Sequence, residues 1–327
     1  MVQVQVQAPL SPAPSGAPVP AVTEPLWKIR WRLLVRGFRQ NWEVFRESRI
    51  GLIGLGIILF FGLFGAAWPI MMHFVDPNIY NPITGFDPMS MPHPSPPSLR
   101  HWLGTDPIGR DILGQLMYST HREFLIGVLA ALITVVIGTL IGTVAGYYGG
   151  FTDTFFMRLA DIMILFPFIP LLIVVGSFIR MGMFEFAWIS GVLGGFGGIT
   201  IVLKSQALSI KVRSYIDAAK VAGGSDFHII RAHIIPNVMP LSFLYMMFNV
   251  TGTILGEATL SYFGILNIDM SWGMMIHTAD SAGYLISFDQ YWWLWLPAGL
   301  AITLFCAAFY MVGRGLDEVV NPRLRKR

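Results

Sequence analysis

Long apolar runs constrain this chain more than any other feature, and the first covers residues 50–74 without an Asp, Glu, Lys or Arg. A helix that crosses a bilayer needs about 20 consecutive apolar residues. Hydrophobic residues make up 54% of the sequence and charged residues only 13%, so a soluble core could not hide all of this apolar surface. The sequence therefore predicts an all-α polytopic membrane protein.

Six transmembrane helices are predicted from these runs. Pro167 and Pro170 interrupt the third run, so we expect a kink or local unwinding there. The single cysteine, Cys306, lies inside the last run, which excludes an intramolecular disulfide. The six runs cover residues 50–74, 124–147, 155–179, 184–203, 235–259 and 291–312.

The segments around the apolar runs differ in composition. Pro, Ala, Val and Gln dominate residues 1–25, which we expect to be disordered. Basic residues alternate with aromatic and aliphatic residues over 26–49, a pattern that suits an anionic lipid surface. Nucleic-acid binding is the rival interpretation, and a span that follows directly disfavours it. The other predicted parts are an extracytoplasmic segment at 75–120, a permease domain at 121–313 and a basic cytoplasmic tail at 314–327.

Arg and Lys residues set the expected orientation. Most of them fall in the N-terminal segment, the polar interval 204–236 and the C-terminal tail, and cytoplasmic loops are the ones enriched in these residues. Both termini and the interval 204–236 are therefore expected in the cytoplasm. The opposite side keeps only Arg100, Arg110, Arg122 and Arg180.

The polar interval 204–236 contains start and stop signals for two short helices. Ser214 is expected to cap the first, with an acidic residue at its N3 position, and Gly223 is expected to end it in a left-handed conformation. Ser225 starts the second helix and Pro236 marks its junction with the fifth span. These features predict a helix-turn-helix that contacts another protein, or an ordinary interhelical loop. The candidate residues are Ser214, Asp217, Ala218, Ala219, Ala222, Gly223, Ser225, Asp226 and Pro236.

The spacing of Asp217, its two following alanines, Gly223 and Pro236 resembles the EAA loop of ABC-importer permeases. The run from His233 to Asn237 is similar to the end of that motif in dipeptide, oligopeptide and nickel importers. Asp stands where Glu is usual, which keeps the charge. The resemblance implies a type I importer permease whose loop helix sits in a cleft of an ATPase subunit and transmits its closure to the spans.

A second run before the second span resembles the LGTD-x-x-GRD signature of the same permeases. Asp106 is expected to cap a short helix with Pro107 at its first position. The closing NPRLR run, residues 321–325, also resembles the family's last residues. The residues of the second motif are Gly104, Thr105, Asp106, Gly109, Arg110 and Asp111.

The fifth span carries an ionisable residue, Glu257, and such residues at membrane depth are functional candidates. Its surroundings, GEATLSYFG, resemble the family's E-A-x-L-S-F-L-G run, and Glu257 is expected to face the translocation path or to tie the span to the following loop. Ser271–Gly273 resembles a segment near the extracellular gate, although its aromatic content also suits an interfacial belt. The translocation and gate candidates are Asn249, Glu257, Ser261 and Trp272.

The chain has no P-loop, zincin or nucleophile-elbow motif, so we expect no enzyme activity. His228 and His233 are expected to pack rather than to bind a metal. The resemblance implies that ATP and Mg are bound by two ATPase subunits, and that a homologous permease and an extracytoplasmic binding protein complete the assembly. A secondary transporter or a channel uncoupled from an ATPase is the alternative. Peptides, nickel complexes and oligosaccharides all remain open as substrates.

Overall fold

The computed structural model describes residues 25–320, and every regular element among them is a helix. Most of the tail predicted at 1–25 and residues 321–327 lie outside the described residues. The chain divides into two units, Met1–Glu43 and Val44–Arg327. The first unit contributes most of α1 (Leu26–Phe45), so most of the basic segment is helical, with Trp27 and Trp31 exposed.

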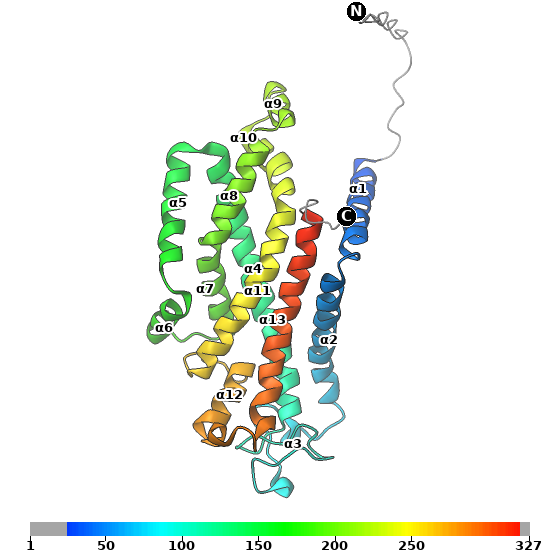
Figure 1. Ribbon diagram of the computed structural model, residues 1–327, viewed down its shortest axis with the longest axis vertical. Coiled ribbons are helices and arrows are strands. Elements are labelled where there is room, and N and C mark those ends of the chain that lie inside the picture. The colour runs from blue at the N-terminus through cyan, green and yellow to red at the C-terminus, as the bar shows by residue number, and fades with distance from the viewer. Residues whose placement is uncertain (1–24, 321–327) are drawn as a thin grey trace, which may run out of the picture. The chain divides into compact units, whose positions relative to one another are not determined.

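The second unit is built on four helices long and apolar enough to cross a membrane (Figure 1). Two further pairs of shorter helices pass the same test together, which gives six spans if each pair counts as one. The four long elements are α2 (Arg49–Met71), α4 (Ile112–Tyr148), α11 (Ile235–Tyr262) and α13 (Trp292–Val320). The pairs are α5 (Gly150–Leu165) with α6 (Phe168–Phe178), and α7 (Met183–Gly195) with α8 (Gly198–Lys211).

The kink predicted in the third run is confirmed, and two helices extend beyond the predicted segment boundaries. The third run breaks between α5 and α6 with an angle of 89°, because Pro167 donates no backbone hydrogen bond and holds Phe166 in an extended conformation. The helix α4 begins at Ile112, inside the segment assigned to 75–120, and α13 continues into the predicted tail as far as Val320. Terminal helical turns carry polar residues, and an apolarity pattern cannot detect them.

The helix α4 lies in the middle of the bundle and packs against α2, α7, α8 and α11. Glycines allow its close approach to α8: a Cβ at Gly142 would lie 2.9 Å from the Thr200 carbonyl oxygen, and one at Gly146 would lie 3.0 Å from the Ala207 Cβ. The i, i+4 glycine repeat of this helix is therefore a helix-packing face.

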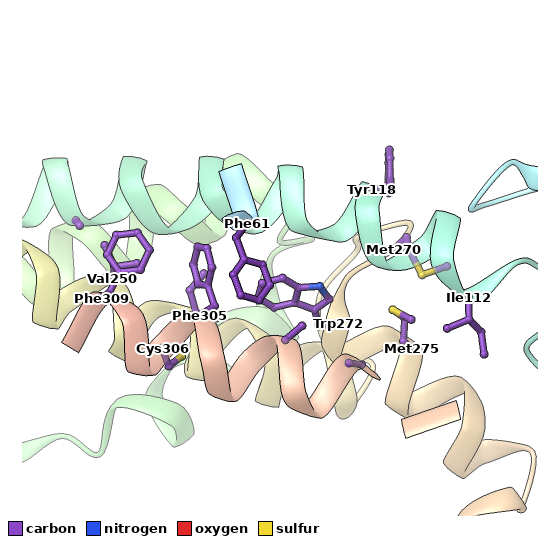
Figure 2. Packing of buried hydrophobic residues seen from close by; sticks show 14 of the residues in the cluster. Phe61, Ile112, Tyr118, Val250, Met270, Trp272, Met275, Phe305, Cys306 and Phe309 are labelled. Carbon is purple, nitrogen blue, oxygen red and sulfur yellow. The ribbon is translucent and has the colours of Figure 1, made fainter. Parts of the chain in front are cut away.

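The two ends of the bundle carry different connections (Figure 1). One end, here called the α9 end, has α9 (Ser214–Val221), α10 (Asp226–Ile229) and the π-helical turn η2 (Ile230–Ile234). The opposite end, called the α12 end, has α3 (Pro77–Tyr80), the 3-10 turns η1 (Pro88–Ser90) and η3 (Tyr284–Ser287), and α12 (Trp272–Ser281). An aromatic core connects α12 to the bundle, with Trp272 packed among Phe61 of α2 and Phe305 of α13 (Figure 2).

Candidate functional site: the loop at the α9 end and its counterpart

The elbow predicted in the loop is present. Gly223 follows α9 with φ at +83°, a conformation that favours glycine over any residue with a Cβ. A Cβ at this position would meet no atom within 4 Å, so the backbone conformation alone requires the glycine. The elbow lets the chain reverse between α9 and α10 at an exposed position.

The predicted cap of the first helix is wrong. The helix α9 begins at Ser214, with Arg213 in the N-cap position and no capping hydrogen bond from its side chain. Asp217 lies in the first turn, and its Oδ1 is 3.7 Å from Lys220 Nζ in an exposed pair, which contributes little to stability. The buried residue Ile216, rather than a cap, positions α9.

The second helix begins as predicted and ends differently. Ser225 Oγ accepts a hydrogen bond from the His228 N–H at 3.3 Å, with Asp226 in the first turn. The helix does not stop before the fifth span, because Asp226–Tyr262 forms one run of 37 residues through the turn η2. Pro236 lies in the first turn of α11, and the π turn that precedes it accommodates its missing N–H.

Contacts with three spans hold the loop. Ile216 is the one buried residue of α9 and packs in a cluster that includes Tyr147 of α4, Leu203 of α8 and Ile234 of η2. The Tyr147 hydroxyl donates to Asp226 Oδ1 at 2.5 Å, and Lys211 Nζ donates to the Tyr147 carbonyl at 2.5 Å. Sequence reasoning missed Tyr147, because it lies far from the motif along the chain, and it counted Lys211, three residues before α9, only among the basic residues of the interval 204–236.

The other face of the loop is exposed and partly apolar. Val221 is 90% exposed and Phe227 is 70% exposed, and Ala218 and Ala222 are exposed as well. Ala219 is only partly exposed, since it packs on the Ile216 cluster. The rings of His228 and His233 pack edge to face, with their centroids 5.8 Å apart. The loop thus has a buried anchor on one side and an uncovered surface on the other.

At the α12 end the second motif forms a compact turn before α4. Gly104 and Gly109 have φ of +79° and +94°. Asp106 does not cap a helix: its carboxylate accepts from the N–H of Ile108 and Arg110, and Oδ2 is 2.6 Å from Arg110 Nη2. The cap of α4 is Asp111, whose Oδ2 accepts from the Gly114 N–H, while the Thr105 hydroxyl accepts from the Ser95 N–H. The cap lies five residues later than predicted, which leaves Asp106 free to close the turn.

A buried histidine lies beside this turn and was not identified from the sequence. His101 has its Nδ1 2.8 Å from Asp111 Oδ1 and its Nε2 3.1 Å from Asp87 Oδ2. The hydrogen bond to Asp111 raises the pKa of His101, against the opposing effect of burial. Burial alone would raise the pKa of Asp87, but hydrogen bonds from Ser90, the Met89 N–H and His101, together with the charge of Arg100, lower it to about 2.

Glu257, Ser261 and Trp272 lie near one another, whereas Asn249 lies apart from them. Glu257 is fully buried, and its Oε1 accepts from the Ser261 hydroxyl at 2.5 Å. Its carboxyl group also contacts the Ser271 side chain, which supports the interpretation that it ties α11 to the following loop. Trp272 is fully buried, so it belongs to no interfacial belt. Asn249 is partly buried two turns away from Glu257, next to Gly194 of α7.

Comparisons with known proteins identify the family of the chain. Residues 138–326 match the family model described as binding-protein-dependent transport system inner membrane component. The chain is 30% identical to the dipeptide transport system permease protein DppC of Bacillus subtilis, over 87% of this chain and 85% of that protein. It is 32% identical to the oligopeptide transport system permease protein OppC of the same organism, over 86% of this chain and 88% of that protein.

The oligopeptide permease OppC of Haemophilus influenzae is 35% identical over 69% of this chain and 71% of its own length. These permeases are non-catalytic, multi-pass proteins of the cell membrane that act with ATPase and substrate-binding partners. The match to the family model covers more than half of the chain. The chain therefore belongs to the binding-protein-dependent transport system inner membrane components, as a permease subunit of an ABC importer.

Proposed function

We propose that this chain forms half of the translocation path for peptides, in a heterodimer with a homologous permease. Two ATPase subunits bind ATP and Mg, an extracytoplasmic binding protein delivers the substrate, and this chain itself binds no cofactor. The relatives, which are dipeptide and oligopeptide permeases, support the substrate class. The distribution of Lys and Arg supports placing the α9 end in the cytoplasm.

The loop at the α9 end carries this proposal. A docking element needs an exposed surface, and Val221, Phe227 and Tyr215 supply one that is rich in apolar side chains. The same element needs a stiff connection to the spans, which Ile216 and the Tyr147–Asp226 hydrogen bond supply. A partner that moves α9 would therefore move α4, α8 and α11 with it.

Selectivity follows from what lines the spans. Buried charges that converge at mid-bilayer depth would mark a tight substrate site. Apart from the region around Glu257 and the Asp153–Lys204 ion pair between α5 and α8, the described spans carry mainly aliphatic and aromatic residues with Gly, Thr and Ser, and Asn249 is partly buried. We infer that the binding protein sets specificity and that the permease is a permissive conduit. Micromolar affinity of the complex for its ligand without the binding protein, abolished by Asn249→Leu, would contradict the conduit model.

Cysteine cross-linking tests the docking surface directly. In a Cys306→Ala background, Val221→Cys should form a cross-link to an ATPase subunit in membranes. Ile286→Cys is the matched control, since Ile286 is 88% exposed but lies at the opposite end in η3. A cross-link from position 286 and none from 221 would reverse the proposed orientation. No ATPase cross-link from either position, with all subunits copurified, would refute the docking surface.

A further inference from the structure

Two carboxyl groups meet inside the bundle. Glu123 of α4 and Glu257 of α11 are both fully buried, and their side chains are within hydrogen-bonding reach of each other. The helices are close at this level, because a Cβ on Gly127, one turn after Glu123, would lie 2.9 Å from Val250 Cγ1 and 3.2 Å from Ile254 Cδ1. The pair therefore lies at a tight contact between two spans.

The surroundings of the pair are mostly apolar. Trp272, Phe61 and Phe305 form an aromatic cluster around α12 and the neighbouring part of α4 (Figure 2). Cys306 of α13 is the other titratable side chain near Glu123. Within residues 25–320, no Lys, Arg or His forms an ion pair with either carboxyl group.

Donors for two carboxylates are missing. Glu257 receives the Ser261 hydroxyl on Oε1, and Ser271 and the Trp272 N–H lie beside the two carboxyl groups. Even so, Glu257 Oε2 and both oxygens of Glu123 accept no hydrogen bond of good geometry from the described residues. Buried polar atoms are rarely left without partners, and two adjacent carboxyl groups in a medium of low polarity cannot both carry a charge. A proton on one carboxyl group supplies the missing donor and removes one of the charges.

We propose that Glu123 and Glu257 share one proton and so form a clasp that holds α4 against α11. The clasp extends to α12, because Ser271 contacts the Glu257 carboxyl and its own Oγ caps α12 by accepting from the Met274 N–H. When α4 and α11 are together the proton has two carboxyl partners, and when they separate it has one. Removal of the proton leaves two like charges that repel the helices.

Infrared spectroscopy of the detergent-purified importer, with the full chain, tests the protonation state without any assumption about transport. The difference spectrum of wild type minus Glu123→Gln/Glu257→Gln at neutral pH should contain one protonated-carboxylic-acid band and one set of carboxylate bands. Carboxylate bands alone would show two ionised groups, and acid bands alone would show two neutral groups. Either of these results would overturn the shared proton.

A distance measurement tests the clasp. Spin labels at Leu125→Cys and Leu255→Cys, both partly exposed positions on α4 and α11, are introduced with Cys306→Ala. Raising the pH should lengthen the distance between the labels in the chain that keeps both glutamates. In the Glu123→Gln/Glu257→Gln chain the distance should stay unchanged, because amides keep the hydrogen bond and cannot ionise. Equal responses, or no response in either chain, would refute the clasp while leaving the docking proposal intact.

Discussion

At the α12 end, directional polar contacts fix the connection into α4. At the α9 end, a cluster of buried isoleucines and two hydrogen bonds at Tyr147 hold the connection between α8 and α11. The first region places Asp87, His101 and Asp111 in a buried network. The second leaves most of α9 exposed and turns at Gly223. Hydrogen bonds to charged groups fix angles as well as distances, while an apolar contact tolerates rotation.

This difference indicates separate tasks. The network at the α12 end specifies one geometry for the start of α4 and resists deformation. The loop at the α9 end presents an exposed surface on a mainly apolar anchor, so it is suited to pass a displacement from a bound partner to the spans. Substitutions that exchange or remove these features test the distinction.

The largest effect on stability is expected from Asp111→Ala. It removes the cap of α4, worth about 1 kcal/mol, and leaves buried His101 without its closer partner, which costs about 1–3 kcal/mol more. Thermal unfolding of the purified complex should show a clearly lower midpoint. The control is Asp76→Ala, which removes the exposed cap of the four-residue helix α3. An equal decrease of the unfolding midpoint in both variants would show that the buried network adds no stability beyond that of a helix cap.

Gly223→Val is expected to affect coupling more than folding. A β-branched residue at φ +83° is strained by about 1–3 kcal/mol, so the elbow should change shape and α9 should dock poorly. Transport and substrate-stimulated ATPase activity should fall together while the subunits still copurify. Gly299→Val, at a helical glycine with open space around it, should keep both activities. Normal coupling in the Gly223 variant would show that the elbow conformation is dispensable.

Tyr147→Phe should have a smaller effect of the same kind. The variant keeps the aromatic packing and loses the hydrogen bond to Asp226, worth about 1 kcal/mol. The ratio of peptide transported to ATP hydrolysed should decrease, with little change in the melting midpoint. Tyr148→Phe is the matched control at the adjacent, half-exposed tyrosine. A similar decrease in both variants would contradict a specific role for the Tyr147 hydroxyl.

The smallest effect is a pH dependence of the α12 end. The raised pKa of His101 means that its stabilisation is fully present below 6.5 and is lost as the pH rises through the folded-state value. The lowered pKa of Asp87 means that its contribution is present above 3.8 and is lost as the pH falls toward about 2. Stability of this region should therefore be greatest between 3.8 and 6.5.

Limited proteolysis of residues 75–111 across this pH range measures the effect. In the wild type, protection from proteolysis should decline as the pH rises above 6.5. In His101→Gln, whose amide does not titrate, protection should not change with pH in that range. An unchanged alkaline decline in the variant would assign the effect to another group.

Local signals in the sequence predicted the local structure well. The apolar runs, the Gly223 elbow and the Ser225 cap were recognised because each depends on neighbouring residues. The prediction that Asp106 caps a helix failed, since Asp106 pairs with Arg110 and the cap is Asp111, which pairs with His101. The contact between Glu123 and Glu257 could not be predicted from neighbouring residues, because it depends on how α4 and α11 pack.

The unbroken run Asp226–Tyr262 has a mechanical consequence. Its 37 residues, at 1.5 Å per residue, make a rod of about 55 Å, nearly twice the hydrocarbon thickness of a bilayer. A tilt of about 5° around one end of such a rod displaces the other end by about 5 Å. The lever begins beside the elbow and ends just beyond Glu257 and Ser261, so an ångström-scale push on Asp226 reaches the opposite side of the membrane without passing through any flexible connection.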